Sequence, residues 1–318
     1  HCLQNDRPGI GTLINEVHDI ALTVQDFECD LSRRIPRIAG ITPRREVSPP
    51  DIVSGVFNTT TTGAPLTMFF PNNDTHSQDY EQFREIPRPG HADLTGRQKF
   101  FGFNDHRGGG HFSGRVTVGI VAAGVVAKKI LSGISIHAEL VEVGGQTDID
   151  TAFDAAVRTH DSCGGIVRCT ITNVPTGLGE PFFDSVESLI SHAIFAIPGI
   201  KGIEFGAGFA AARMRGSEHN DHIVDENGTT ATNNAGGING GITNGNPIVF
   251  SVAVKPTSSI GIPQQTCNIR SGAIDTLICG GRHDACFALR VPVIVEAMTA
   301  CVLADLVLLR HTYTNPSS

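Results

Sequence analysis

The segment from Val116 to Leu131 limits the possible folds more than any other. It reads VTVGIVAAGVVAKKIL, which is small and apolar on nearly every side of a helix. A helix at the protein surface has one polar face, and a helix without such a face must be covered all round. The sequence therefore predicts a buried central helix over this segment.

Shorter patterns on both sides predict the elements that cover it. The predicted strands are Ile10–Val17, Ile52–Phe57, Leu66–Phe70, Ile134–Val143, Gly165–Val174 and Ile248–Val254, with the second and third forming a hairpin. Further helices are predicted to start within Val24–Leu31 and to cover Asp148–Arg158, Asp184–Ala196 and about Phe287–Arg310. The last contains Arg290, Glu296 and Asp305, which argue against a membrane span. No linker or repeat interrupts the chain, so one α+β domain is predicted for residues 1–318.

Composition excludes several classes of protein. The net charge of −8 disfavours nucleic acid as a partner, and any anionic ligand would need arginines focused in a cleft. The eight cysteines contain no CxxC pair, which predicts reduced thiols and no zinc site. Without a leader or an uncharged spanning segment, we expect a cytoplasmic protein. The chain begins with His, so its N-terminus is expected to be incomplete or processed.

The segment Arg88–Thr117 differs sharply from the apolar helix that follows it. It contains four Arg, three His, two Asp and seven Gly in thirty residues, which predicts a loop or loop pair that faces a ligand. Gly108–Gly110 would let backbone N–H groups approach an anion. Arg107 and Arg115 offer forked donors, and His91 and His106 can move protons near neutral pH. The chemistry indicated is anion binding with proton transfer.

Other segments are ambiguous when considered alone. A basic cluster at Arg33–Arg45 favours a solvated surface, and KPTSS (Lys255–Ser259) after a predicted strand fits a phosphate site or a polar turn equally well. The glycine-rich segments Gly202–Phe209 and Ala235–Asn246 are predicted loops, and the first is not a convincing dinucleotide motif. Arg282–Asp284 (RHD) at a glycine hinge favours a site over a salt-bridged cap.

Taken together, these strings resemble the chorismate synthase family. The matching motifs include RPGHAD (Arg88–Asp93), DHRGGGHFSGR (Asp105–Arg115), NNAGGINGGI (Asn233–Ile242), KPTSS and GGRHDAC (Gly280–Cys286), in family order. The resemblance covers about Leu31 to Asp305. It implies a single-domain α+β fold with central buried helices between antiparallel sheets, and a homotetramer. It also implies a lyase of aromatic amino acid biosynthesis, which makes chorismate by 1,4-anti elimination of phosphate from 5-enolpyruvylshikimate 3-phosphate and requires reduced FMN.

The resemblance also implies roles for individual residues. His91 resembles the histidine that keeps the flavin in its useful protonation state, and Asp284 resembles the proton relay beside flavin N5. The phosphate and carboxylates of the substrate would bind Arg34, Arg45, Arg107 and Arg115. The basic cluster at Arg33–Arg45 is therefore interpreted as part of the site and not as a solvated surface. The implied FMN-binding residues are His111, Phe112, Ser113, Pro198, Gly199, Gly240, Lys255, Pro256, Thr257, Ser258, Ser259 and Arg282.

One departure lies in residues 1–30, which are either diverged or incomplete. LQNDR (Leu3–Arg7) stands where the family has GESHG, so Asp6 replaces the histidine thought to protonate the leaving phosphate. Loss of a general acid typically costs about 10²–10⁴-fold in rate. A catalytically impaired paralogue that binds flavin or substrate without turnover is therefore the alternative. A flavin reductase that uses NAD(P)H is a third hypothesis, with NADPH as a candidate reductant.

Overall fold

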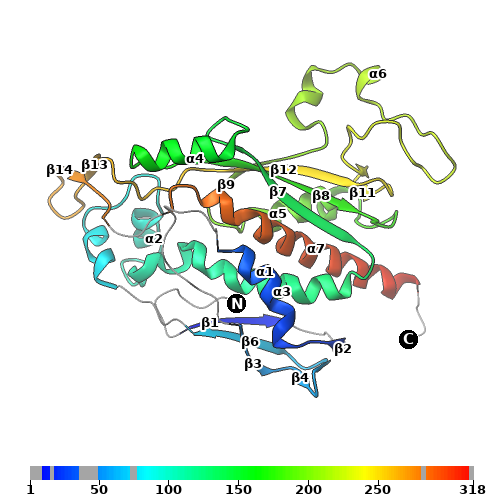
Figure 1. The fold of residues 1–318 in the computed structure, drawn as a ribbon, viewed down its shortest axis with the longest axis horizontal. Coiled ribbons are helices and arrows are strands. Elements are labelled where there is room, and N and C mark those ends of the chain that lie inside the picture. The colour runs from blue at the N-terminus through cyan, green and yellow to red at the C-terminus, as the bar shows by residue number, and fades with distance from the viewer. Residues whose placement is uncertain (1–8, 15–17, 36–48, 72–76, 281–283, 315–318) are drawn as a thin grey trace.

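The protein is built as two antiparallel sheets with a pair of long helices between them (Figure 1). The structure, a computed structural model, describes residues 9–14, 18–35, 49–71, 77–280 and 284–314. One sheet has four strands in the order β7-β8-β12-β9, and the other has three in the order β1-β6-β3. This arrangement confirms the predicted α+β fold with central helices between antiparallel sheets.

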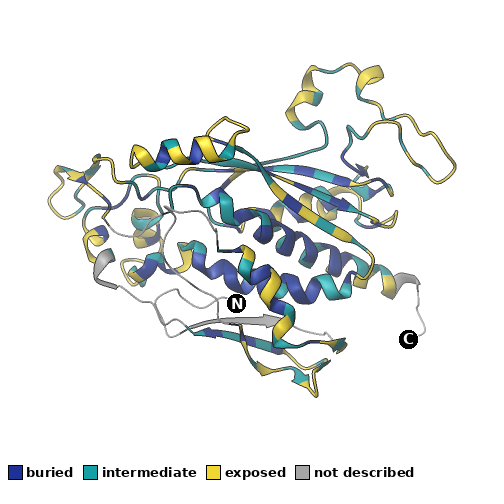
Figure 2. Cartoon of the chain, in the orientation of Figure 1, coloured by how far each residue is buried: buried dark blue, intermediate teal, exposed yellow. Residues whose placement is uncertain are grey.

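The two central helices are α3 (Thr117–Ile130) and α7 (Val291–Thr314), and they pack against each other. Most of α3 is buried, as its apolar sequence predicted, and buried positions run along α7 as well (Figure 2). At the crossing, Gly124 lies so close to Ala297 that a Cβ atom at Gly124 would overlap that alanine. Phe287–His311 is long and apolar enough to cross a membrane, but most of it is buried inside the protein, as expected for a core helix.

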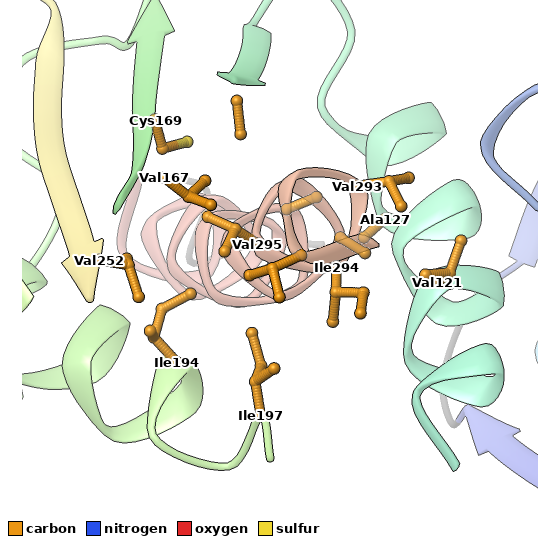
Figure 3. Close-up of a cluster of buried hydrophobic side chains, with 14 of the residues drawn as sticks. Val121, Ala127, Val167, Cys169, Ile194, Ile197, Val252, Val293, Ile294 and Val295 are labelled. Carbon is orange, nitrogen blue, oxygen red and sulfur yellow. The ribbon is translucent and has the colours of Figure 1, made fainter. Parts of the chain in front are cut away.

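The larger sheet covers α7. It consists of β7 (Ser135–Val143), β8 (Gly165–Thr172), β9 (Ile200–Phe205) and β12 (Ile248–Val254), all antiparallel. Val167 and Cys169 of β8 and Val252 of β12 face the apolar side chains of α7 (Figure 3). Two further helices complete this half, α4 (Ile149–Arg158) against β7 and α5 (Val186–Ile194) against α7.

The smaller sheet lies on the side of α3. It pairs β6 (Leu66–Pro71) with β1 (Gly9–Ile14) and with β3 (Asp51–Ser54). The predicted hairpin is therefore present, with β4 (Val56–Phe57) and β5 (Thr60–Thr62) in its connection, where β5 also pairs with β2 (His18–Ala21). Helix α1 (Glu28–Arg33) follows the short 3₁₀ helix η1 (Val24–Phe27) and packs against α3.

Two sequence predictions need correction, and one hairpin was not predicted. The predicted glycine loop Gly202–Phe209 begins within β9, because Gly202–Phe205 pair with β12 and Gly202 lies opposite Ala253. The predicted loop pair Arg88–Thr117 contains α2 (Asp93–Lys99) and two 3₁₀ helices, η3 (Arg107–Phe112) and η4 (Gly114–Val116). The hairpin of β13 (Gln264–Cys267) and β14 (Ile274–Leu277) was not predicted, because its polar strands show little alternation.

The remaining described elements are short. They are η2 (Ser77–Arg84), η5 (Phe182–Asp184), η6 (Gly208–Arg213), α6 (Gly216–His219), β10 (Ile238–Asn239), β11 (Ile242–Thr243) and η7 (Phe287–Arg290). The seven cysteines that the structure describes carry free thiols. Within the described ranges, no group of three or more His, Cys, Asp or Glu side chains could hold a metal ion.

Candidate functional site

Arg88 is the centre of the first cluster of site residues. Its side chain is almost fully buried, and its guanidinium forms a fork on Asp93, with Nε and Nη2 each 2.8 Å from a carboxylate oxygen. Nη1 donates to Ser259 Oγ at 2.9 Å. The guanidinium also lies 4.2 Å from the centre of the Phe83 ring, within the range of a cation–π contact. Arg88 thus joins RPGHAD to KPTSS, which are 171 residues apart at this contact.

His91 is oriented by the same carboxylate. Its Nδ1 lies 2.7 Å from Asp93 Oδ1, and Arg88 Nη2 is 3.1 Å from this nitrogen. The other ring nitrogen, Nε2, is 4.0 Å from the place that a Cβ atom would take at Gly109. Burial alone would raise the pKa of Asp93, but hydrogen bonds from Arg88 and His91 outweigh it and hold that pKa well below its usual range. Asp93 is therefore a permanent anion that fixes the histidine ring.

This depressed pKa predicts a specific acid sensitivity. Because the folded-state pKa of Asp93 lies below the ordinary value of 3.8, its stabilisation is fully present above that value. It is lost as the pH falls towards the folded-state pKa. We expect the free energy of unfolding of the wild type to fall more steeply below pH 4 or so than that of Asp93→Asn. Urea unfolding at a series of pH values measures this, and parallel curves for the two proteins would refute it.

The KPTSS segment begins at the residue after β12 and turns back towards Arg88. Lys255 Nζ donates to Ser258 Oγ at 2.8 Å, and Ser258 Oγ donates to the carbonyl of Gly90 at 2.7 Å. Burial, followed by the positive charges of Lys201 and Arg88, lowers the pKa of Lys255. Positive charge is thus concentrated here in a chain whose overall charge is negative. An anion bound here would relieve the repulsion between these cations.

The three glycines of RGGG form the turn that leads to Phe112. Gly108, Gly109 and Gly110 all have positive φ values, of 60°, 79° and 55°, which other residues rarely adopt. The ring of Phe112 then packs over Gly96 of α2, where a Cβ atom would lie 2.6 Å from Phe112 Cε2. Gly109 and Phe112 line a pocket of about 370 Å³ beside α2, with Phe83 and Leu94 among its other walls.

A second cluster lies where α1 meets the start of α3. Arg34, at the end of α1, is buried and donates from Nη2 to Thr117 Oγ1 at 3.2 Å. Thr117 Oγ1 in turn donates to the carbonyl of Gly114 at 2.6 Å. Arg115, also buried, lies between these two residues in the chain, and its backbone N–H donates to Ser113 Oγ at 3.3 Å. Two predicted substrate-binding arginines are therefore brought to the same end of α3.

Asp284 joins this second cluster through Arg290. The Asp284 carboxylate lies 3.1 Å from both Nε and Nη2 of Arg290. Nη1 of the same guanidinium donates to the backbone carbonyl of Arg34 at 3.1 Å. The predicted proton relay and a predicted substrate-binding residue thus share one partner.

Phe287 lies between the two clusters. Its ring is next to Gly114, where a Cβ atom would be 2.8 Å from Phe287 Cε2, and next to Gly199, where the distance to Cδ1 would be 3.7 Å. Gly199 accepts a hydrogen bond from the backbone N–H of Lys255 at 2.9 Å. Pro198 and Gly199 are thereby placed beside KPTSS, and the contacts through Phe287 connect both clusters into one region.

Some predicted site residues are placed elsewhere or lie outside the described residues. Arg107 forms a fork on Asp105 within its own loop, with distances of 2.8 and 2.6 Å, and His111 is exposed. Gly240 lies between β10 and β11, and β11 is at the end of the molecule opposite α2 and β13 (Figure 1). Arg45 and Arg282 lie outside the described residues, as do the N-terminal residues Leu3–Arg7.

Sequence reasoning missed three contributors to this region. Asp93 lies inside the quoted RPGHAD motif, and a carboxylate two residues after a histidine was a usable signal. Phe287 and Arg290 gave no such signal, because an aromatic and an arginine at a helix start are ordinary there. Only the folded chain brings them to Gly114 and Arg34.

Comparison with known proteins decides the family. The sequence matches the family model described as chorismate synthase over residues 6–308. This chain belongs to the chorismate synthase family. Its relatives include the chorismate synthase of Chitinophaga pinensis, 61% identical over 293 residues, covering 92% of this chain and 88% of the relative. The chorismate synthase of Thermococcus gammatolerans is 44% identical, covering 92% of this chain and 90% of that protein.

A solved structure agrees with the family assignment. A crystal structure of a chorismate synthase superposes with a TM-score of 0.74 at 26% sequence identity, covering 97% of this chain and 90% of the other. The resemblance to chorismate synthase and the predicted fold are therefore confirmed. Membership of this family supports a lyase of the shikimate pathway that acts on a small-molecule substrate.

Proposed function

We propose that this chain catalyses the 1,4-anti elimination of phosphate from 5-enolpyruvylshikimate 3-phosphate to give chorismate, with reduced FMN bound. The observation that carries the proposal is the junction at Phe287, because it joins the cluster of His91 and Lys255 to the cluster of Arg34 and Asp284. Proton-handling groups and anion-binding groups thus belong to one region, as an elimination of phosphate requires.

The reaction balances without net oxidation. The C3–O bond breaks and its electron pair leaves with the phosphate, while the C6 proton is removed. The electrons of the C6–H bond form a C1=C6 double bond, and the pair of the existing C1=C2 bond shifts to C2=C3 as the phosphate leaves, which makes the ring a conjugated diene. The chain therefore has to bind three anionic groups, accept one proton and stabilise departing phosphate.

The described residues divide these tasks. Arg34 and Arg115 would bind the phosphate and carboxylates of the substrate, since buried guanidinium groups form strong charge-assisted hydrogen bonds with both. Asp284 would relay the proton lost from C6. His91, held by Asp93 through Nδ1 and with Nε2 near Gly109, would act beside the cofactor. Arg107 is the weakest of the assigned substrate residues, because its guanidinium already forks on Asp105.

The residues of KPTSS fit a flavin mononucleotide. Thr257 Oγ1 is buried and has no hydrogen-bond partner among the described residues, which is costly unless a ligand supplies one. Lys255 and Ser258 beside it would hold the FMN phosphate, with Pro256 and Ser259 shaping the turn. Ser113, Phe112, His111, Pro198, Gly199 and Arg282 would contribute further contacts. Reduced FMN, when bound, would supply electron density that assists phosphate departure.

The position of Gly240 supports the proposed homotetramer. Gly237, at the base of its hairpin, packs against the carbonyl of Pro247, just before β12, whereas Lys255 follows the other end of that strand. A strand rises by about 3.3 Å per residue, so these points are about 25 Å apart. A flavin mononucleotide is too short to bridge them, but a neighbouring copy could supply Gly240 to the site. We further propose a single domain for residues 1–318, supported by a hydrophobic cluster that extends from Leu22 to Leu306, and a cytoplasmic location.

An anaerobic assay tests the activity. Purified protein, 5-enolpyruvylshikimate 3-phosphate and chemically reduced FMN should release phosphate and form chorismate in equal amounts. We expect His91→Ala to lower the rate by about 10²-fold or more, as is typical for loss of a group that controls proton transfer. The exposed His222→Ala serves as the matched control and should leave the rate unchanged.

The outcome separates the three hypotheses. Tight flavin and substrate binding without phosphate release would favour the catalytically impaired paralogue, a hypothesis motivated by Asp6 at the position of the GESHG histidine. Flavin reduction by NADPH alone would add a reductase activity, with NADPH as the physiological reductant. Absence of both binding and turnover would refute the proposed function.

A further inference from the structure

Arg290 contacts two residues to which the proposed function gives roles. One is the carboxylate of Asp284, six residues before it, and the other is the backbone of Arg34, 256 residues away. Two nitrogens lie 3.1 Å from the carboxylate oxygens, and the third donates to the Arg34 carbonyl at 3.1 Å. Nη1 and Nη2 therefore form hydrogen bonds within the region of the site, and Nε lies at ion-pair distance from the carboxylate without an aligned hydrogen bond.

Burial makes this arrangement restrictive. The side chains of Arg290 and Asp284 retain only 14% and 17% of their exposure, so water competes poorly for these contacts. A planar guanidinium also fixes the direction of each of its partners, which a lysine could not do. Rotation of Arg290 would break its contacts with the Asp284 carboxylate and with the backbone carbonyl of Arg34.

Helices α1 and α7 are also linked at Glu296, six residues after Arg290 in the chain. Arg33 forks on Glu296, with distances of 2.6 and 2.7 Å, and so ties α1 to α7 independently of Arg290. The attachment of α1 therefore does not depend on Arg290 alone. Loss of Arg290 should disturb the local geometry of Arg34 and Asp284 while the helices remain packed.

We propose that Arg290 is a positioning residue that holds the Asp284 carboxylate and the backbone of Arg34 in one arrangement, so that the proton relay and a substrate-binding arginine face the same ligand. This inference rests on the proposed function, because it assigns Arg290 a part in that reaction. Arg290 itself need not touch the substrate. Its effect on the rate passes through Asp284, and its effect on substrate affinity passes through Arg34.

The test compares Arg290→Gln, Arg290→Lys and Arg310→Gln in the full-length protein with reduced FMN. Arg310 is the matched control, because it lies near the other end of α7 and also donates to a backbone carbonyl, that of Thr176, at 2.8 Å. We expect Arg290→Gln to lower kcat by about 10²-fold, to raise KM and to alter the pH profile of kcat. Arg290→Lys should recover only part of kcat, and Arg310→Gln should behave as the wild type.

Repeating the Arg290→Gln substitution in the Asp284→Asn variant distinguishes positioning from a merely structural role. If Arg290 acts through Asp284, the loss in kcat from Arg290→Gln should largely disappear when Asp284→Asn is already present. Equal losses in both backgrounds would overturn the inference, as would an unchanged kcat and pH profile for Arg290→Gln beside an active wild type. A wild type that neither binds nor converts the substrate overturns the proposed function and this inference together. Urea unfolding of Arg290→Lys, expected to match the wild type closely, shows that the fold is intact.

Discussion

Replacing Arg88 with Met is expected to lower the free energy of unfolding by about 3–5 kcal/mol. The substitution removes a buried cation and leaves the Asp93 carboxylate, which is 12% exposed, with His91 and the backbone N–H of residue 88, at 3.1 Å, as its remaining partners in the cluster. It also removes the donor to Ser259 Oγ and the cation–π contact with Phe83. Because Arg88 connects RPGHAD to KPTSS, flavin affinity should fall with stability. Urea unfolding and a flavin titration measure the two effects.

Replacing both Arg88 and Asp93 separates the net contribution of their ion pair to stability from the cost of leaving one partner buried without the other. The double variant Arg88→Met, Asp93→Leu buries no unpaired charge and should recover much of the stability lost in the single variant. Arg270→Met is the surface control, since Arg270 is 80% exposed in its ion pair with Glu85 and should change stability by less than about 0.5 kcal/mol. A loss for Arg88→Met as small as that of the control would contradict the central position assigned to Arg88.

Glu296→Ala should be the second severe substitution. Glu296 is 2% exposed in the middle of the core, where it accepts the fork of Arg33, a bond from Lys128 Nζ at 3.0 Å and one from the Ala138 N–H at 2.9 Å. Burial would raise the pKa of Glu296, but the hydrogen bond from Arg33 and the charge of Lys128 lower it below its usual value. Removing the Glu296 carboxylate would take a hydrogen-bond acceptor from Arg33 of α1, from Lys128 of α3 and from the backbone N–H of Ala138 in β7.

We expect Glu296→Ala to lower the free energy of unfolding by about 3 kcal/mol, at the lower end for buried pairs. The loss is limited because the Arg33 side chain is 37% exposed and Lys128 keeps its ion pair with Asp30. Asp305→Ala is the matched control, an exposed acid on the same helix. Glu296→Gln should be intermediate, since the amide oxygen can still accept from Ala138. Unfolding of Glu296→Ala at the same urea concentration as Asp305→Ala would show that the network adds no net stability.

Hydrophobic patterning predicted the centre of the fold well. The bounds of α3, β7 and β12 agree closely with the predicted helix Val116–Leu131 and the predicted strands Ile134–Val143 and Ile248–Val254. Full burial leaves a clear apolar pattern in the sequence. Prediction was weaker where polar groups or glycine form regular elements. Strand β9 was missed because Gly202 and Gly206 suggested a loop, and α2 was missed within a segment dominated by charge.

Motifs indicated the residues of the candidate site but not their arrangement. RPGHAD and KPTSS are separated by more than 160 residues, and nothing in either string predicts that Arg88 donates to Ser259. The link through Phe287 and Arg290 was equally hidden, because it depends on where α7 begins relative to α1 and α3. Such contacts follow from tertiary packing, which short patterns do not contain.

Strand β12 has consequences for how many complete sites an assembly can form. Lys255–Ser259 follow one end of the strand, and the hairpin with Gly240 packs near the other. In the proposed homotetramer, each chain would therefore contribute one end of β12 to its own site and the other end to the site of a neighbour. Two inactive variants, one altered at Lys255 and the other at Gly240, would complement each other in mixed tetramers, since some sites would combine two unaltered ends. The number of complete sites in such a tetramer would then depend on which chains are neighbours, and not on how many chains are unaltered.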